Sequence, residues 1–545
     1  MAGEDWRGLE KAVARLMAHS GWQNVVLVGE SGDQGADVIG TRSEGVSATT
    51  FVTQVKAVTA ANMVGPDAVD QVLGAMASYG SQVGVVATNG VFNKATEARA
   101  RQLCSQGFRI KLWNGAFLRQ LFEGCPSGHA FKKTPRKYQK TIIEQSPTSV
   151  SRGSQRQHFV LATGLGKTLI AAEILMELFR QGRRRFLVLC HMKDLADQLE
   201  ISFWSQMPKE LPTWTFYEGE QPVFRDGVNF GLFQSLASYV HAIEPGTFDA
   251  VFVDEAHHAP AHTYRRCLEH LRPEFMLGMT ATPWHKEEGG IESLFGERIG
   301  EISLSQGLAM GYLAQVDYSV FCDNIDWAAL SGMTGHKFSV SDLNKRLFIP
   351  QRDEVIAKNI ADECQNLVHP KVIIFCPSVE HGRRFANVLT AAGISCKDLS
   401  GVSKVERYKR MLEFSTGRLK ALTAVDVLNE GIDLPMVNVV VFLRCTHSRR
   451  VFVQQLGRGL RLVDGKTKVR AMDFVADLRR LAEVVTLDKE YKEHSRTGEI
   501  YELNFGKSEI RFTNERVRSF VEEWAEDVRS ISELGDKTII DFPKS

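Results

Sequence analysis

The chain has 545 residues, and its 66 Lys plus Arg against 65 Asp plus Glu give a net charge of +1. This length exceeds what one hydrophobic core can serve and predicts roughly three or four domains. No apolar run reaches the roughly 18 residues that span a bilayer, and the nine cysteines form no C-x-x-C pair. We therefore expect a cytoplasmic protein without a membrane segment, a zinc knuckle or a disulfide framework. Basic residues cluster at 131–140, 180–186 and 407–410, where they either form solvated surface or contact phosphate.

The first 125 residues alternate between helical and strand patterns. Apolar residues recur with a helical period over 6–19. Strand patterns follow at 24–28, 37–40, 51–58, 82–87 and 108–113, and further helical patterns at 94–106 and 117–122. We expect an α/β domain over 1–125, and a linker over 126–134.

From about residue 159 the pattern changes to short apolar strands separated by helical stretches. The strands are expected at 159–161, 186–190, 250–253 and 276–278, then again at 371–376, 421–424 and 437–443. Such alternation is typical of parallel sheets covered by helices. It predicts one domain over 135–305, a connecting segment over 306–352 and a similar domain over 353–481. The charged extension over 482–545 has a mostly helical pattern.

The segment FVLATGLGKT indicates a phosphate-binding loop. A strand enters a glycine-rich turn and a helix follows at once, so backbone N–H groups around Gly164 and Gly166 can face an anion. Lys167 can reach the β- and γ-phosphates of ATP, and the Thr168 hydroxyl can bind Mg²⁺.

A second motif, FDAVFVDEAHH, places two adjacent carboxylates at the end of an apolar strand. The carboxyl ends of parallel strands are where α/β proteins bind ligands. Asp254 can hold Mg²⁺ through water, and Glu255 can orient and deprotonate the water that attacks the γ-phosphate.

Taken together, these motifs resemble those of superfamily 2 helicases and translocases, in the correct order over about 135–481. The matching segments are RKYQKTII, ATGLGKT, VLCHMKDLADQ, VDEAH, MTATP, IIFCPS, AVDVLNEGIDLP and QQLGRGLR. The resemblance implies two RecA-like domains that bind ATP between them and hold a nucleic-acid backbone. The nucleotide-binding residues that it implies are Gln139, Thr163, Gly164, Gly166, Lys167, Thr168, Gly431 and Asp433.

The same resemblance assigns roles to later residues. Arg458 and Arg461 would be arginine fingers that reach the γ-phosphate when the two domains close. Thr280 and Thr282 would link the nucleotide state to movement. Contacts to phosphate carry no sequence information, so we expect a motor that is sequence-indifferent and salt-sensitive.

The amino-terminal domain contains a candidate metal site in GADVIGTRSEGVSATTFVTQVK. Gln54 and Lys56 lie two apart on a strand and therefore share a face, and the neighbouring strand offers Asp37. Carboxylate and amide oxygens suit Mg²⁺, and Lys56 could stabilise charge on a phosphate. Glu10 lies at the margin of the apolar stripe of the first helix. The alternative is a polar hairpin that faces solvent.

Residues 4–122 resemble the Mrr-type restriction endonuclease domain of the PD-(D/E)xK nucleases. The resemblance rests on LEKAVARLMAHSGWQNVVLVGESGDQGADVIG, FVTQVK and VGVVATNGVFNKATEARARQ. It implies a magnesium site made by Glu10, Asp37, Gln54 and Lys56, in which Asp37 and Gln54 bind the metal. Gln54 stands where the wider group has Asp or Glu. The Mrr branch itself has Gln at this position. A neutral amide in place of a carboxylate lowers the negative charge of the ligand set.

The sequence thus favours an ATP-dependent DNA helicase or translocase joined to a Mg²⁺-dependent DNA endonuclease, in restriction or anti-phage defence. Double-stranded DNA is the expected substrate, and partner subunits of a defence system are expected. Two alternatives remain open. The amino-terminal domain could recognise DNA without cutting it, or the motor could be an RNA helicase with an accessory domain.

Overall fold

The computed structural model describes residues 6–28, 35–44, 47–59, 62–151, 155–217, 219–259, 262–281, 290–321, 337–339, 353–425, 434, 436–443, 457, 459–462, 466–474, 510–512 and 539–541. The chain divides into two compact units: residues 1–159 with 166–300, and residues 160–165 with 301–545. Among the described residues, no helix is both long enough and apolar enough to cross a membrane.

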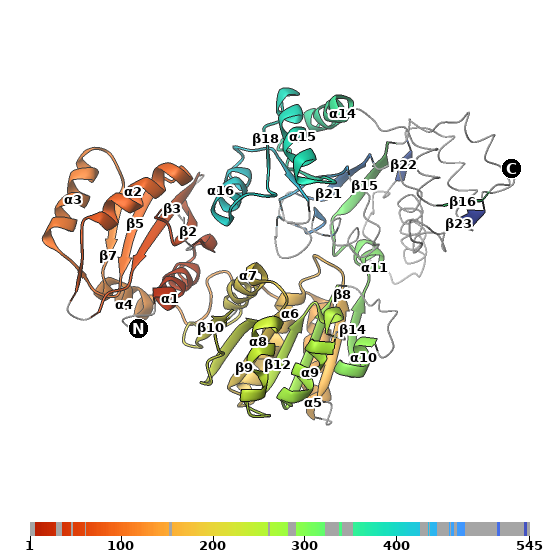
Figure 1. Ribbon diagram of the computed structural model, residues 1–545, viewed down its shortest axis with the longest axis horizontal. Helices are drawn as coiled ribbons and strands as arrows, with labels where there is room; N and C mark the ends of the chain where they lie inside the picture. Colours follow the sequence, from red (N-terminus) through yellow and green to blue (C-terminus); the bar gives the residue numbers. More distant parts are fainter. Residues whose placement is uncertain are drawn as a thin grey trace. The chain divides into compact units, whose positions relative to one another are not determined.

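The first unit begins with an α/β domain, red to orange in Figure 1. Its helices are α1 (Trp6–His19), α2 (Asp67–Tyr79), α3 (Lys94–Ser105) and α4 (Gly115–Gly124). Its strands are β1 (Gln23–Leu27), β2 (Val38–Glu44), β3 (Ser47–Lys56), β4 (Met63–Val64), β5 (Val83–Thr88), β6 (Val91–Phe92) and β7 (Ile110–Trp113). The main sheet has the order β1-β2-β3-β5-β7, and β4 pairs with β6. The pairs β1–β2 and β2–β3 are antiparallel, whereas β3–β5 and β5–β7 are parallel.

The strand period gives this sheet two chemically different faces. Phe51, Val55 and Val85 form one buried cluster with Leu9 and Val13 of α1. The alternate residues face α2, because a Cβ on Gly84 would lie 2.7 Å from the Met76 sulfur. Since side chains alternate along a strand, Gln54 and Lys56 share this second face, opposite the one that α1 covers.

Helix α2 has no counterpart among the helices expected from the sequence. Its buried residues, Ala68, Val69, Val72, Ala75, Met76 and Tyr79, recur with a helical period. Gly80 ends it in the left-handed region with φ 58°, a conformation that glycine adopts without strain. Gly74 within the segment weakens the sequence signal, since glycine lowers helix propensity.

A buried histidine at the end of α1 should make this unit sensitive to acid. His19 is 1% exposed and neither ring nitrogen has a hydrogen-bond partner among the described residues. Burial, helped by the charge of Arg15, lowers the pKa of His19 from 6.5 to about 4. Below pH 6.5 the unfolded chain binds a proton that the folded chain excludes, so stability falls between about pH 6.5 and pH 4.

We therefore expect His19→Phe to flatten the dependence of stability on pH. The wild type should lose on the order of 1 kcal/mol more than the variant between pH 7.5 and pH 5. Urea unfolding of both proteins at the two pH values measures the difference. Replacement of the exposed His262 by Phe is the control, and equal slopes for the wild type and His19→Phe would contradict the prediction.

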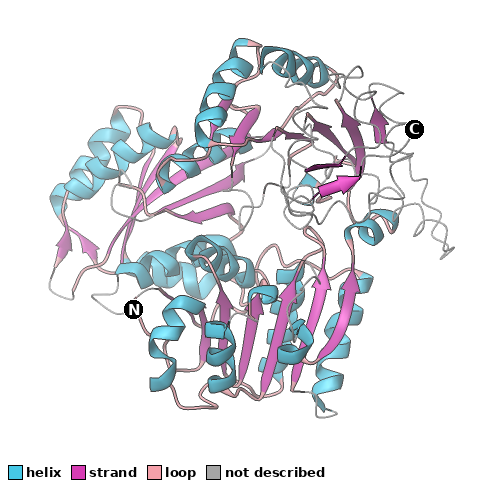
Figure 2. Cartoon of the chain, turned by 45° about the vertical axis from the view of Figure 1, so that its right-hand side comes forward, coloured by secondary structure: helices cyan, strands magenta, loops and turns pink. Residues whose placement is uncertain are grey.

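The second part of the first unit is built around a seven-stranded sheet. Its helices are α5 (Lys137–Ser151), α6 (Lys167–Arg180), α7 (Lys193–Trp204), α8 (Phe233–Tyr239), α9 (His262–Leu271) and α10 (Gly290–Phe295). Its strands are β8 (Arg156–Leu161), β9 (Arg185–Cys190), β10 (Thr213–Phe216), β11 (Gly227–Leu232), β12 (Ala250–Asp254), β13 (Phe275–Thr280) and β14 (Glu297–Ile302). The order is β10-β11-β9-β12-β13-β8-β14, and Figure 2 shows helices on both faces of these strands.

The central strands of this sheet are parallel and buried. β9 pairs with β11 and β12, and β12 pairs with β13, all in parallel. Every residue of β12 and β13 is buried. Continuous apolar runs suit strands that are covered on both faces, which is why the sequence identified β9, β12 and β13. It did not identify β11, which lies inside the sheet, or the edge strands β10 and β14.

The second unit contains a sheet of the same build. Its described helices are α11 (Leu304–Ala309), α14 (Asp353–Gln365), α15 (Val379–Ala391) and α16 (Lys404–Ser415). Its strands are β15 (Gln315–Val320), β17 (Val372–Phe375), β18 (Cys396–Asp398), β19 (Ala421–Ala424), β20 (Val439–Phe442), β21 (Lys468–Asp473) and β22 (Ile510–Phe512). The order is β18-β19-β17-β20-β21-β15-β22. A separate pair joins β16 (Lys337–Ser339) to β23 (Ile539–Asp541).

Two predicted boundaries in this unit need correction. The segment 306–352 is not only a connection, because β15 pairs in parallel with β21 and so belongs to the second sheet. The extension 482–545 also contributes a strand, since β22 pairs with β15. Both strands lie at one side of the sheet, away from the central strands, and β22 has only three residues. The helices expected in the extension lie outside the described residues.

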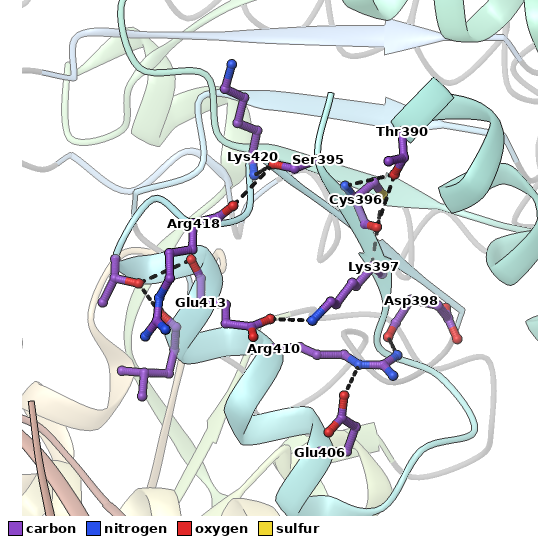
Figure 3. A network of polar contacts seen from close by, with 12 residues as sticks. Thr390, Ser395, Cys396, Lys397, Asp398, Glu406, Arg410, Glu413, Arg418 and Lys420 are labelled. Carbon is purple, nitrogen blue, oxygen red and sulfur yellow. Dashed lines mark hydrogen bonds and ion pairs between the residues drawn. The ribbon is translucent and has the colours of Figure 1, made fainter. Parts of the chain in front are cut away.

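Polar contacts fasten α16 to β18, as Figure 3 shows. Lys397 Nζ lies 2.7 Å from Glu413 Oε2, and Arg410 Nε lies 2.7 Å from Glu406 Oε1. Arg410 also donates to the Asp398 carbonyl. The guanidinium of Arg410 is thus engaged by its own domain, which favours a structural role for this member of the basic cluster 407–410.

Candidate ATP and nuclease sites

The phosphate loop has the geometry that its sequence predicts. α6 begins at Lys167, directly after the buried strand β8 and the loop 162–166. Gly164 and Gly166 have φ values of 91° and 81°, which favour glycine. A Cβ on Gly166 would lie 2.5 Å from the Gln139 amide nitrogen. Gln139 therefore lies against the loop, and a side chain at position 166 would collide with it.

The two carboxylates of the DEAH segment lie at the carboxyl end of β12. Lys167 Nζ is 3.4 Å from Glu255 Oε1, so the lysine that begins α6 and the carboxylate pair meet within the first unit. Asp254 ends β12, opposite Met279 on β13. Glu255 has a left-handed backbone with φ 48°, a conformation that costs energy for a residue with a side chain.

The electrostatics differ between the two carboxylates. Burial, together with the nearby charge of Glu255, raises the pKa of Asp254 to about 6. Burial alone would also raise the pKa of Glu255, but Lys167 and His257 outweigh it and hold that pKa well below its usual range. Glu255 is therefore ionised at neutral pH, as a group that orients and deprotonates water must be.

The structure adds His257, to which the sequence assigned no role. His257 is 2% exposed, and its Nδ1 lies 3.2 Å from Glu255 Oε2 and 2.8 Å from the Thr280 hydroxyl. It therefore connects the DEAH carboxylate with Thr280, the described threonine of the MTATP segment. The available signal was its place in the DEAH motif itself, three residues after Asp254.

Some of the other residues predicted for the ATP site are described by the structure, and the rest lie outside the described residues. Within the second unit, a Cβ on Gly164 would lie 3.2 Å from Arg461 Cγ, and a Cβ on Gly457 would lie 2.9 Å from the Thr163 Cβ. Thr168 occupies the second position of α6. Thr282, Gly431, Asp433 and Arg458 lie outside the described residues.

In the amino-terminal domain the structure brings Asp37 and Gln54 together. Asp37 Oδ2 accepts hydrogen bonds from the Gln54 amide, at 2.6 Å, and from the Val55 backbone N–H, at 2.5 Å. Asp37 is 4% exposed and Gln54 5%. A solvated hairpin would expose both side chains. Their burial and their mutual hydrogen bond therefore favour an organised binding site over a polar surface.

The oxygen atoms of this pair suit a divalent cation. Gln54 Oε1 is buried and has no hydrogen-bond partner among the described residues, which leaves it able to bind a metal ion. Lys56 follows on the same face of β3 and is half-buried. No group of three or more His, Cys, Asp or Glu side chains in the described part of the chain could hold a metal. A site here would therefore depend on the Gln54 amide oxygen and keep several water ligands, as Mg²⁺ commonly does.

Glu10 is buried on α1, whose core residues pack on the sheet face opposite Gln54. The part of Glu10 in the site stays a prediction.

Three family descriptions match the chain in succession. "Restriction endonuclease", the Mrr catalytic domain, matches residues 1–122. "Type III restriction enzyme, res subunit" matches residues 132–285, and "Helicase conserved C-terminal domain" matches residues 351–463. These ranges correspond to the amino-terminal domain and to the two domains with seven-stranded sheets.

Similar proteins include restriction enzymes. The type I restriction enzyme EcoAI endonuclease subunit of Escherichia coli is 25% identical over 455 residues, which cover 72% of this chain and 54% of that subunit. The EcoKI endonuclease subunit of Escherichia coli K12 is 22% identical over 423 residues, which cover 65% and 35%. The chain thus spans about half or less of the length of these relatives.

A solved structure shares the fold. The ATP-dependent type ISP restriction-modification enzyme LlaBIII bound to DNA aligns with a TM-score of 0.53 and 17% identity, covering 97% of this chain and 42% of that one. The predicted resemblances are confirmed: the chain combines a restriction endonuclease domain of the Mrr type with the two domains of a helicase.

Proposed function

We propose that this protein is an ATP-driven DNA helicase or translocase that also cuts DNA with a Mg²⁺-dependent nuclease, in restriction or anti-phage defence. The observation that carries the proposal is the presence in one chain of two built sites. One is the Lys167–Glu255 pair beside the phosphate loop, and the other is the buried Asp37–Gln54 pair.

In the motor, Lys167 would hold the β- and γ-phosphates, while Glu255 would take the proton from the attacking water. His257 Nδ1 lies close to both the Glu255 carboxylate and the Thr280 hydroxyl, so it would help to position Glu255. The arginine fingers proposed at Arg458 and Arg461 would complete the charge stabilisation, so hydrolysis would depend on closure of the two domains.

In the nuclease domain, Asp37 and Gln54 would hold Mg²⁺, with Glu10 as a further candidate ligand. When bound, the ion would supply charge stabilisation at the scissile phosphate and a more acidic water. The hydrogen bonds from Gln54 and Val55 orient the Asp37 carboxylate, and Lys56 would stabilise the negative charge that develops on the phosphate.

The test is to measure ATP hydrolysis and DNA cleavage by the purified protein with plasmid, single-stranded DNA or RNA, with and without Mg²⁺. We expect DNA to stimulate ATP hydrolysis and the plasmid to be cut only with Mg²⁺. The stimulation should weaken as salt rises, because contacts to phosphate release counterions. Stimulation by RNA alone would support an RNA helicase. Tight DNA binding that needs residues 1–125, without cleavage, would support a recognition domain.

A further inference from the structure

Helix α1 of the nuclease domain has a second face that the proposed nuclease chemistry does not use. One face buries Leu9, Val13 and Met17 in the domain core. Arg7, Lys11 and Arg15 follow one another at intervals of four residues, which places them along a single different face. Three cations in a row on a helix are usually solvated, but two of these are engaged in the interior of the first unit.

The contacts of this second face are made with the motor's first domain. Lys11 Nζ lies 3.0 Å from Glu200 Oε2 on α7, and the Glu200 side chain is fully buried. Arg15 donates to the carbonyl oxygens of Pro208 and Leu211, both at 2.7 Å. Arg7 pairs with Glu220 at the exposed edge.

Glu200 is held from both sides. Its Oε1 accepts a 2.6 Å hydrogen bond from the Thr213 hydroxyl, and the same hydroxyl accepts from the Trp204 indole N–H at 3.1 Å. A buried carboxylate that loses its cation is strongly unfavourable, because no solvent replaces the missing charge. The Lys11–Glu200 pair is therefore suited to fixing one geometry between the two domains.

An apolar contact supports the polar ones. Trp204, the last residue of α7, has no exposed surface and belongs to the same hydrophobic cluster as Leu9 and Val13 of α1. The Arg15 guanidinium lies 5.9 Å from its ring. The motor's first domain thus contributes a large side chain to the core of the nuclease domain, which is unlike a contact between domains that separate readily.

The two helices connect two functional segments. α7 begins at Lys193, two residues after His191, in the segment that resembles the strand-binding motif after β9. α1 contains Glu10, a candidate nuclease residue, and packs against the sheet of the nuclease domain. A displacement of α7 would therefore act on α1 directly, through Lys11 and Trp204.

On this geometry, and resting on the function proposed above, we propose that the nuclease domain and the first motor domain move as one body, fixed by the Lys11–Glu200 pair. DNA would then be cut at a constant place relative to the strand that the first motor domain holds. Lys11, Arg15 and Glu200 are positioning residues in this proposal, since they do not touch the DNA phosphate that is cut.

A distance measurement tests the proposal without relying on activity. Cys104 is exposed, whereas the other described cysteines are buried, so it can carry one spin label. A second label is placed at Thr263→Cys, on the exposed side of α9, after Cys322 and Cys445 are replaced by Ser. Pulsed EPR should give one narrow distance distribution that does not change when a non-hydrolysable ATP analogue and DNA are added.

Charge exchange tests the residues. Lys11→Glu and Glu200→Lys should each broaden the distance distribution and lower ATP-dependent DNA cleavage roughly 10- to 100-fold, because a small misplacement far from the chemistry has effects of this size. DNA-stimulated ATP hydrolysis should stay near the wild-type rate. The double exchange should restore a narrow distribution and most of the cleavage. Arg101→Glu, at an exposed position of α3, is the matched control.

If the distances between the two labels in the wild-type protein are broadly distributed, or shift when nucleotide is added, the proposal is overturned. This outcome does not depend on whether a single variant folds. Unchanged distances and cleavage in both folded single variants overturn the role of the pair. A protein that shows the narrow distribution but neither cuts DNA nor hydrolyses ATP would refute the proposed function while leaving the joined domains intact.

Discussion

Lys167→Ala and Glu255→Gln should each abolish ATP hydrolysis while leaving the fold intact. Lys167 is the cation that we propose holds the terminal phosphates, and Glu255 is the ionised carboxylate next to it. Loss of a general base alone lowers rates by roughly 10²–10⁴. The two variants should differ in binding, since Glu255→Gln keeps Lys167 and so should still bind ATP.

Steady-state phosphate release with saturating DNA measures the rates, and equilibrium binding of a fluorescent ATP analogue separates the two effects. Glu177→Gln, on the exposed side of the same helix α6, is the control and should hydrolyse ATP normally. Hydrolysis by Glu255→Gln at more than about a tenth of the wild-type rate would exclude Glu255 as the base.

Asp37→Asn should abolish DNA cleavage and leave DNA-stimulated ATP hydrolysis within about twofold of wild type. The substitution keeps the size of the side chain but removes its charge, which a bound cation requires. We expect a loss of cleavage of at least about 10³-fold, as for the removal of a principal electrostatic contact. Nicking and linearisation of plasmid in Mg²⁺ measure the effect, and thermal unfolding shows whether the domain remains folded.

A second variant, Gln54→Glu, tests whether position 54 contributes to metal binding. A carboxylate at position 54 would lie against Asp37, where the Gln54 amide now donates a 2.6 Å hydrogen bond. Without metal, the two like charges should lower stability, and Mg²⁺ should restore it more effectively than in the wild type. If Mg²⁺ raised the unfolding temperature of neither protein, Asp37 and Gln54 would not form a metal site.

The interpretation of the phosphate loop and of the DEAH carboxylates followed from local sequence, because these residues lie at the ends of strands. Gly164, Gly166 and Lys167 follow one buried strand, and Asp254 and Glu255 follow another. The carboxyl ends of neighbouring parallel strands meet at one edge, so local patterns are enough to bring Lys167 and Glu255 together. The contact between His257 and Thr280 was decided by tertiary structure, since it depends on where two side chains on different elements point.

The nuclease site was only partly determined by sequence. The strand period put Gln54 and Lys56 on one face, but it could not show that Asp37 and Gln54 are buried and bonded to each other. Burial depends on α2, a helix that the sequence signal missed, because that helix covers the face on which Gln54 lies. Local pattern cannot report which element covers a sheet face, since that is decided by packing between distant segments.

The sequence by itself determined the order of the domains, the phosphate loop, the DEAH carboxylates and the candidate residues Asp37, Gln54 and Lys56, because each is a short pattern with its own physical cause. Tertiary structure alone decided the strands β15 and β22 of the second sheet and the contact of Lys11 and Arg15 with the motor's first domain. Lys11 and Glu200 are far apart in the chain and carry no pattern that links them. A buried pair of opposite charges exists only when the fold brings both residues out of water at the same place.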